Sequence, residues 1–368
     1  MFLRKLEINN FRNIKKAYFN FDKKINIFIG ENAQGKTNVL ESIYFLSITK
    51  SHRTNNEFNL IKNSELYTKL SCTYEKEDES YSSLSILLNN NGKKVSVDNI
   101  MQKRISNYLS RLNVIMFCPD DLEIVKGSPS IRRKFLNIEL SQLNNNYLNY
   151  LKNYNYILKE RNEYLKHNNN FNKVYFDILT EKLIEEEIKI LKERYFFIDE
   201  INEYLPLVYE SIAKEGKITI EYISFVNKED LKAKNVKDII KEKYKKVFES
   251  EKLQKTTLLG IHKDDFKIIL NSLDVTQYGS QGQQRMAILS IKLSEIKLYL
   301  EIKKIKPIVL LDDIFSELDE NKKNNIIKYC NEDLQIFITT TDIKDIEKNL
   351  KNKSDIYITK NGTFIKEE

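Results

Sequence analysis

The sequence predicts an α/β fold with a helical hairpin inserted into it. Near the N-terminus, the apolar stretch Ile25–Ile29 runs into a glycine-containing turn and then into a helical pattern. Near the C-terminus, a second apolar stretch, Ile308–Leu311, ends in two carboxylates. Between them, residues 130–205 contain no Gly or Pro and follow a polar helical pattern. The α/β part is therefore expected to be assembled from both ends of the chain.

The length of 368 residues predicts two structural units, since one domain usually has roughly 100–200 residues. We expect residues 1–118 and 256–368 to form a discontinuous head, lobe I, and residues 119–255 to form a helical lobe II. The hydrophobic fraction of 41%, with only 4 Pro and 9 Gly, argues against a disordered or fibrous chain.

The charge balance is mildly basic, with 60 Lys and Arg against 53 Asp and Glu. The first sixty residues hold ten of these cations and five of the anions. A basic face is what binding to a phosphate backbone requires. Ordinary solubility charge explains the composition equally well.

Cysteine and histidine usage argues against a disulfide framework or a zinc site. The cysteines, Cys72, Cys118 and Cys330, are far apart and odd in number, and the 3 histidines are dispersed. The N-terminus carries charge where a signal peptide has its apolar stretch, and no apolar run approaches the roughly 20 residues of a membrane span. We expect a cytoplasmic protein that does not bind membranes.

The N-terminal part reads as strands around one helix. Short strands are expected at Leu6–Ile8, Tyr18–Phe21 and Ile25–Ile29, and a helix is expected from Thr37. Residues 66–118 are β-rich, with a turn signal at Asn89–Gly92.

The middle predicts two long helices, Ser130–Leu165 and Asn172–Leu205, with a break at His167–Asn170 and a stop at Pro206. Their heptads are irregular, which favours a helical subdomain over a coiled-coil arm. A strand at Lys217–Val226 and a charged helix at Val236–Ser250 lead back to the core.

The C-terminal part predicts a strand at Pro307–Leu311, a helix and a strand at Gln335–Thr339. A hairpin that turns at Asn361–Gly362 ends the chain.

The segment Gly30–Thr37 fits the P-loop pattern G-x-x-x-x-G-K-[ST]. In such a loop, backbone N–H groups and the start of the next helix bind phosphates. Lys36 is expected to reach the β- and γ-phosphates of ATP, and the Thr37 hydroxyl to bind Mg²⁺. The expected nucleotide-binding residues of this segment are Gly30, Glu31, Asn32, Ala33, Gln34, Gly35, Lys36, Thr37 and Asn38.

The apolar strand before Asp312 and Asp313 has the Walker B pattern. We expect Asp312 to hold Mg²⁺, and Asp313, together with Lys36, to be catalytic, with Asp313 orienting the attacking water. Alone, the pattern also fits a buried strand that ends in a surface acidic pair, but the P-loop makes that alternative the weaker one.

A third motif, Tyr278–Arg285, reads YGSQGQQR and places Ser280 and Gly282 at the start of a helix. Helix N-termini bind anions, and one nucleotide site does not need two of them. Either Ser280 and Gly282 bind the nucleotide of a second subunit, or the segment is a plain turn that opens a helix.

This order of motifs resembles that of ABC ATPases, and several stretches resemble the RecF family of ABC/SMC-type heads. The stretches are Asn10–Asn13, Ser51–Thr54, Pro119–Asn137, Gly260–Asp265 and Ser316–Asp319. The chain departs from the family at Asn137, usually Asp, and at Ile261 and Lys263, usually Pro and Arg.

The resemblance implies a P-loop ABC-type ATPase head, lobe I, with a helical hairpin lobe II. Two subunits would sandwich ATP and Mg²⁺, so that ATP binding drives homodimerisation on DNA, either duplex or an ss/ds junction, and weak, DNA-linked hydrolysis to ADP and phosphate releases it. It implies a role in recombinational DNA repair, the SOS response and replication-fork maintenance, with RecO and RecR as partners in loading RecA at gaps.

Two departures from the wider ABC pattern matter. Asp313 stands where the catalytic Glu is usual, so slow hydrolysis is expected. Thr339–Asp342 stands where transporters carry His, which disfavours a transporter ATPase. The alternatives are an SMC-like or transporter-type head that works with a protein partner, and a non-hydrolytic ATP-binding DNA clamp.

Several side chains have two interpretations. Arg12 either contacts the nucleotide or is a surface arginine beside a strand, and Arg53 is a trans-acting arginine or a DNA contact. Arg132 and Arg133 touch DNA or brace the base of the hairpin, and His262 is expected to be structural. The residues that contact DNA do not follow from the sequence.

Overall fold

The computed structural model describes residues 1–167, 171–213, 216–315, 318–330, 333–341 and 353–367. The chain forms two compact units. Unit 1 contains Met1–Asp121, Leu207–Glu215 and Ile288–Glu368, and unit 2 contains Leu122–Pro206 and Gly216–Ala287. Residues 256–287, which the sequence assigned to the head, thus cluster with unit 2. Within the described ranges, no helix is long and apolar enough to cross a membrane.

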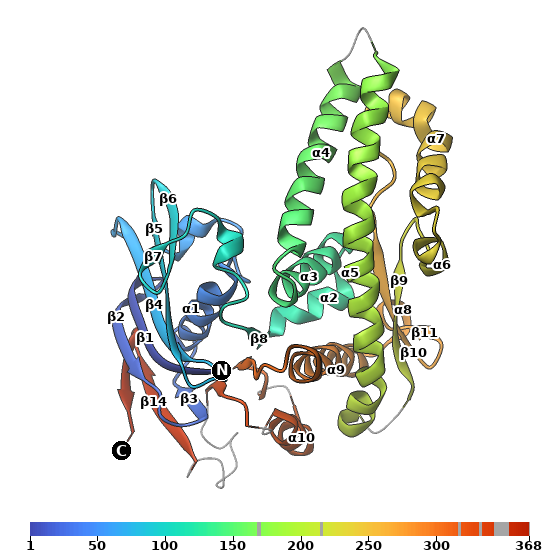
Figure 1. The fold of residues 1–368 in the computed structure, drawn as a ribbon. Helices are drawn as coiled ribbons and strands as arrows, with labels where there is room; N and C mark the ends of the chain where they lie inside the picture. Colours follow the sequence, from blue (N-terminus) through green and yellow to red (C-terminus); the bar gives the residue numbers. More distant parts are fainter. Residues whose placement is uncertain (168–170, 214–215, 316–317, 331–332, 342–352, 368) are drawn as a thin grey trace. The chain divides into compact units, whose positions relative to one another are not determined.

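Unit 1 begins with an antiparallel sheet whose order is β2-β1-β4-β5-β6-β7 (Figure 1). Burial alternates along its strands, as in β1, where Leu6 and Ile8 are buried and Lys5 and Glu7 are exposed. One face therefore packs on the core and the other faces solvent. The strands are β1 (Phe2–Phe11), β2 (Ile14–Asn20), β4 (Tyr67–Glu75), β5 (Tyr81–Asn89), β6 (Gly92–Val97) and β7 (Ile100–Met101).

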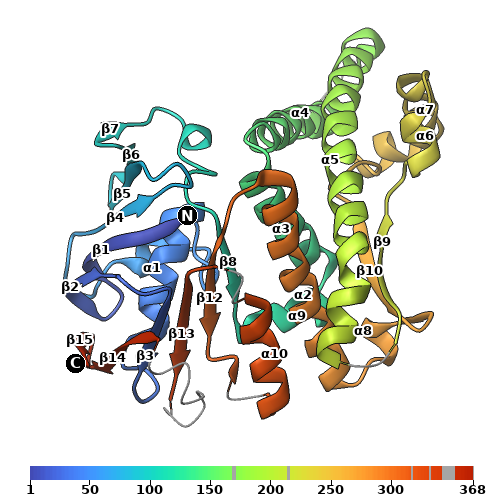
Figure 2. The same cartoon turned by 60° about the horizontal axis from the view of Figure 1, so that its bottom comes forward.

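The second sheet of unit 1 joins strands from both ends of the chain in the order β15-β14-β3-β13-β12-β8 (Figure 2). All neighbours pair in parallel except the hairpin of β14 and β15. β12 and β13 are buried along their whole length, which is typical of a sheet covered on both faces. The strands are β3 (Ile25–Ile29), β8 (Val114–Phe117), β12 (Ile308–Asp312), β13 (Ile336–Thr340), β14 (Ser354–Lys360) and β15 (Thr363–Lys366).

Helix α1 (Lys36–Ile48) contacts strands of both sheets and is buried on nearly all sides. A helix with this burial has apolar residues all round rather than on one stripe. The other helical elements with residues in unit 1 are η1 (Glu57–Leu60), η2 (Ile105–Asn107), η3 (Pro119–Asp121), the end of α5 (Lys173–Ala213) from Leu207 on, the second part of α9 (Gln281–Leu298), η4 (Tyr299–Lys303) and α10 (Glu320–Cys330).

Unit 2 is mainly helical, and its long helices α4 and α5 run side by side (Figure 1). A small antiparallel sheet with the order β11-β10-β9 completes it. Its elements are α2 (Leu122–Lys126), α3 (Pro129–Leu143), α4 (Tyr147–His167), α5 (Lys173–Ala213) up to Pro206, β9 (Ile218–Ile223), α6 (Lys228–Lys232), α7 (Val236–Gln254), β10 (Asp265–Leu270), β11 (Leu273–Asp274), α8 (Val275–Tyr278) and the first part of α9, up to Ala287.

The structure corrects the expected helix boundaries. The stretch 130–165 is two helices, because Asn144 leaves the helical conformation and its side chain accepts a hydrogen bond from the Asn146 N–H (2.9 Å). Helix α5 does not stop at Pro206. Leu205 before it and Val208 after it are both buried, so packing outweighs the lost backbone hydrogen bond. The expected strand at 217–226 pairs with β10 in unit 2.

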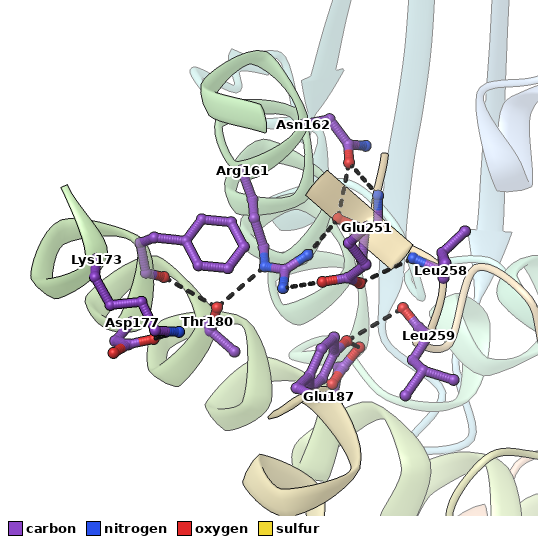
Figure 3. A network of polar contacts seen from close by, with 12 residues as sticks. Arg161, Asn162, Lys173, Asp177, Thr180, Glu187, Glu251, Leu258 and Leu259 are labelled. Atoms are coloured by element: carbon purple, nitrogen blue, oxygen red, sulfur yellow. Dashed lines mark hydrogen bonds and ion pairs between the residues drawn. The ribbon is translucent and has the colours of Figure 1, made fainter. Parts of the chain in front are cut away.

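A buried ion pair joins segments of unit 2 that lie far apart in the sequence (Figure 3). The Arg161 guanidinium binds the Glu251 carboxylate (Nη2–Oε2 2.6 Å), and both side chains are at most 1% exposed. It also donates to the hydroxyls of Thr180 (3.1 Å) and Thr257 (2.7 Å). Glu251 accepts a further bond from the Leu258 N–H (2.9 Å). This single cation therefore links α4, α5, α7 and the segment after α7.

We expect Arg161→Met to lower the free energy of unfolding by about 3–5 kcal/mol, because it leaves the Glu251 charge buried without its cation. Urea denaturation of the full chain measures this. The double variant Arg161→Met/Glu251→Gln, which is neutral and keeps an acceptor for Leu258, should recover part of the loss.

The control is Lys237→Met, which breaks an exposed pair with Glu185. We expect no measurable change there, because solvent screens such pairs. Equal losses in the two methionine variants would contradict the importance of burial.

Candidate nucleotide site

The loop between β3 and α1 wraps around the Lys36 side chain. Lys36 is 6% exposed, and its Nζ donates to the carbonyls of Gly30 (2.5 Å) and Glu31 (2.9 Å). Burial lowers the pKa of Lys36, while the nearby charges of Asp313 and Asp312 act in the opposite direction. A desolvated cation in a loop of backbone amides is a suitable receptor for phosphate.

The two Walker B carboxylates lie at the carboxyl end of β12. The Asp312 carboxylate accepts hydrogen bonds from the hydroxyls of Thr37 (2.8 Å) and Thr339 (2.7 Å). Burial raises the pKa of Asp312, and these two hydrogen bonds oppose that shift. Thr339 also accepts a bond from the Asp313 N–H (2.9 Å), and Asp313 has a left-handed backbone, with φ of 50°. Thr339 thus holds the Asp312 carboxylate and the Asp313 backbone, a role that the sequence did not reveal.

A cavity of about 570 Å³ opens beside this loop, a size typical of small-molecule sites. Of the predicted site residues, Arg12, Asn32, Ala33, Gln34, Gly35, Lys36, Thr37, Asn38 and Asp313 line it, and Arg53 also does. The remaining lining residues are Asn13, Asn59, Ile61, Lys62 and Asn63. Gly30 and Glu31 contact the site through their carbonyls, which accept hydrogen bonds from the Lys36 ammonium. Asp312 contacts it through its bond from the Thr37 hydroxyl. The structure therefore brings the predicted P-loop and Walker B residues together.

Glu41 holds two arginines at the cavity. It lies in α1, is fully buried, and receives the Arg12 guanidinium through two bonds (Nε–Oε2 2.9 Å and Nη2–Oε1 2.7 Å). The Ser51 hydroxyl donates to it (2.5 Å), and Arg53 forms a longer ion pair with it (3.5 Å). Although burial acts to raise its pKa, the bonds from Arg12 and Ser51 leave the pKa of Glu41 below its usual value. Sequence reasoning missed Glu41, which no motif marks.

The turn of the C-terminal hairpin is hydrogen-bonded to the P-loop. Gln34 accepts two backbone N–H groups of the β14–β15 turn, from Asn361 at its side chain (2.6 Å) and from Gly362 at its carbonyl (2.8 Å). Asn13 donates to the same carbonyl (3.2 Å) and accepts from the Asn38 side chain (2.8 Å). The predicted turn at Asn361–Gly362 is confirmed. Its contact with the P-loop joins residues more than 300 positions apart, so no local sequence pattern predicts it.

Ser280 and Gly282 lie in unit 2 at the start of α9, and they do not line the cavity. The Ser280 hydroxyl accepts from the Gln283 N–H (3.2 Å), and the Gln283 side chain accepts from the Ser280 N–H (2.9 Å). This reciprocal pair is a capping box. Both Ser280 and Gly282 are exposed.

The other candidates have structural contacts within unit 2. Arg132 forms a two-bond ion pair with Asp265 (2.6 and 2.9 Å), and Arg133 donates to the Asp264 carbonyl (2.7 Å), which favours bracing over DNA contact. The His262 ring contacts the Tyr154 hydroxyl (2.6 Å), and burial lowers its pKa to about 4. Ser316, Glu317 and Asp342, which belong to two predicted motifs, lie outside the described residues.

Comparison with known proteins decides the family. The model of the RecF/RecN/SMC N-terminal domain matches residues 2–364. The DNA replication and repair protein RecF of Streptococcus gordonii is 39% identical, and the alignment covers 99% of this chain and 100% of that protein. The chain belongs to the RecF family. A second RecF protein, from Bacillus cytotoxicus, is 38% identical over 99% of this chain and 98% of its own length.

Solved structures support the same fold. A structure described as the recombination mediator protein RecF with ATP in the RecFOR pathway superposes with a TM-score of 0.92, at 32% identity, over 100% of this chain and 98% of that chain. An Smc head bound to a winged-helix domain of ScpA has a TM-score of 0.57 at 15% identity, over 100% of this chain and 97% of that chain, which shows a shared fold alone. The predictions of the RecF family and of an ABC/SMC-type head fold are confirmed.

The hairpin contact with the P-loop can be tested at Gly362. Its φ is 73°, and a Cβ there would lie 2.8 Å from the Asn13 carbonyl oxygen, so Gly362→Ala must shift the turn or Asn13. Because both hold Gln34, we expect ATP affinity to fall about tenfold, a loss of about 1.4 kcal/mol in binding. Titration with a fluorescent ATP analogue measures it.

The matched control is Gly92→Ala in the β5–β6 turn, where φ is also positive, at 107°, and a Cβ would meet nothing within 4 Å. This variant strains the backbone without touching the P-loop, so its ATP affinity should equal that of the wild type. Equal affinities for wild type and Gly362→Ala would show that the hairpin does not hold the loop.

Proposed function

We propose that this chain is an ATP-dependent DNA-binding ATPase of recombinational repair and replication-fork maintenance. One observation carries the ATPase part of the proposal. Thr37 of the P-loop and Asp312 of the Walker B strand, 275 positions apart in the sequence, are in direct contact beside the cavity that Lys36 and Asp313 line. The similarity to an ATP-bound RecF structure supports ATP as the ligand.

The donor set suits Mg²⁺, because this ion prefers hard oxygen ligands and is usually held by one or two protein groups together with phosphates. Thr37 and Asp312 would hold it. When bound, Mg²⁺ would neutralise charge that develops on the phosphates. Among the described residues, no cluster of three or more His, Cys, Asp or Glu offers a different metal centre.

The protein side chains divide the reaction between them. Lys36 binds the β- and γ-phosphates, and the Arg12 guanidinium, fixed by Glu41, faces the same cavity. Asp313 orients the attacking water, and the Thr339 hydroxyl sets its backbone. An aspartate reaches one methylene less far than the glutamate usual at this position, so hydrolysis is slow and acts as a timer. Product release then ends DNA binding.

Dimerisation supplies the second half of each site. The exposed Ser280 and Gly282 begin a helix, and a helix N-terminus favours a negatively charged ligand. We infer that they bind the nucleotide held by the partner subunit. By family membership, RecO and RecR are the expected partners, and loading of RecA at gaps is the expected outcome.

The first test is the solution mass of Asp313→Asn, measured by light scattering. We expect a monomer alone, a dimer with ATP and Mg²⁺, and more dimer when duplex DNA is added. Hydrolysis should fall at least about 10²-fold, the usual contribution of a general base. Lys36→Met, which should not bind ATP, is the monomeric control. If Asp313→Asn hydrolysed ATP at the wild-type rate, the assignment of the water-orienting residue would be wrong.

The contribution in trans is tested by Ser280→Arg in the Asp313→Asn background. The long side chain should block the partner's nucleotide, so that the protein stays monomeric with ATP. Thr276→Arg, also exposed and four residues away, is the control and should dimerise normally. ATP-dependent dimers of both arginine variants would exclude the trans arrangement.

A further inference from the structure

The solvent face of the antiparallel sheet carries a row of lysines that the site does not use. The strand register places Lys16 opposite Asn9, Asn9 opposite Lys69, Lys69 opposite Leu87, and Leu87 opposite Lys94. Residues directly opposite each other share a face of the sheet. The row therefore runs across β2, β1, β4, β5 and β6 with a lysine on every second strand.

The next register row lies beside it and is mostly hydroxyl-bearing. It pairs Tyr18 with Glu7, Glu7 with Ser71, Ser71 with Ser85, and Ser85 with Ser96. The only acid of these two rows, Glu7, accepts a hydrogen bond from the Ser71 hydroxyl (3.1 Å). Hydroxyls donate readily to phosphate oxygens, so this row adds neutral donors to the lysine row.

The three lysines of the row are exposed and available to a ligand. Within the described part of the chain, none of Lys16, Lys69 and Lys94 forms an ion pair. Lys93, next to Lys94 but on the opposite face, differs: it binds the Glu57 carboxylate (2.7 Å). The lysine that points inward is thus paired, whereas the three outward lysines form no ion pair within the described residues.

We propose that this row is a DNA-binding surface that contacts the phosphate backbone of a duplex, an inference that rests on the proposed function. Neighbouring strands lie about 4.8 Å apart, so successive lysines are about 10 Å apart. This spacing is close to the major-groove width of about 12 Å, so neighbouring lysines can reach phosphates on the two sides of a groove.

The composition of the face favours DNA over a protein partner. Protein interfaces usually have an apolar core rich in aromatic residues and depleted of lysine. Here Tyr18 and Leu87 are the aromatic and apolar side chains of the two rows, and they lie on different rows and strands, so they form no apolar core. Lysine and hydroxyl contacts to phosphate carry no sequence information, so the surface binds duplex DNA of any sequence.

The test measures duplex binding by the full chain with ATP and Mg²⁺, using fluorescence anisotropy over a range of salt concentrations. The variant is Lys16→Gln/Lys69→Gln/Lys94→Gln. Each lost phosphate contact should lower the slope of log affinity against log salt by about 0.9, hence by about 2.7 for three. We expect the affinity near 0.1 M salt to fall more than about tenfold. ATP affinity should stay at the wild-type value, which also shows that the variant is folded.

The control variant, Lys15→Gln/Lys304→Gln/Lys328→Gln, removes the same charge from exposed positions of unit 1 off this face. Lys15 is adjacent to Lys16 on β2 but points to the other side. A salt slope equal to that of the wild type in the row variant, or an equal loss of DNA affinity in the control variant, would overturn the proposed surface. The proposed function would stand in that case, because the wild type still binds DNA. A wild type that binds no duplex would overturn the proposed function and this surface together.

Discussion

The parallel pairing of β3 with strands from the far end of the chain is the constraint on which the rest depends. The register aligns Ile29 with Thr340, and Thr339 with Asp312. Parallel strands end at the same edge of a sheet, so the P-loop after β3 and the carboxylates after β12 meet there. A slip of one residue would turn Asp312 away from Thr37, because side chains alternate between faces. The helical unit can be inserted between these segments, since the strand register that aligns them does not involve it.

Burying charge near the phosphates requires fixed partners. Lys36, Glu41 and Asp312 are each at most 6% exposed. An unpaired charge in such a place is strongly disfavoured, so each has dedicated bonds: two carbonyls for Lys36, Arg12 and Ser51 for Glu41, and two threonine hydroxyls for Asp312. Glu41, Ser51 and Thr339, which have no direct role in the proposed reaction, thus help to organise the site. Such preorganisation is what electrostatic stabilisation of a transition state needs.

The sequence predicts the parts of the site that depend on local geometry. The P-loop and the Walker B strand are short segments whose backbone performs the function, so spacing alone identifies them. The roles of Glu41 and Thr339 could not be predicted in this way, because their bonding partners are distant in the sequence and only the fold brings them close. Two predicted helix boundaries were wrong for other reasons. Helix rules end a helix at Pro206, but buried neighbours on both sides let α5 continue. They continue a helix through Asn144, but the Asn144 side chain accepts a bond from the Asn146 N–H and forms a turn there.

The β1–β2 hairpin connects the nucleotide site to the proposed DNA surface within one unit. Its turn carries Arg12, whose N–H binds the Leu60 carbonyl (2.8 Å) and whose φ of 54° fits a tight turn. Only four residues further along the chain, Lys16 belongs to the exposed row. Paired strands transmit a shift along their length because every backbone hydrogen bond must move with it. A change in how Arg12 meets the nucleotide would therefore reach Lys16 through β2, and Lys69 through β1 and β4. If Arg12 contacts the nucleotide and the lysine row binds DNA, as proposed above, this hairpin would connect the two sites within unit 1.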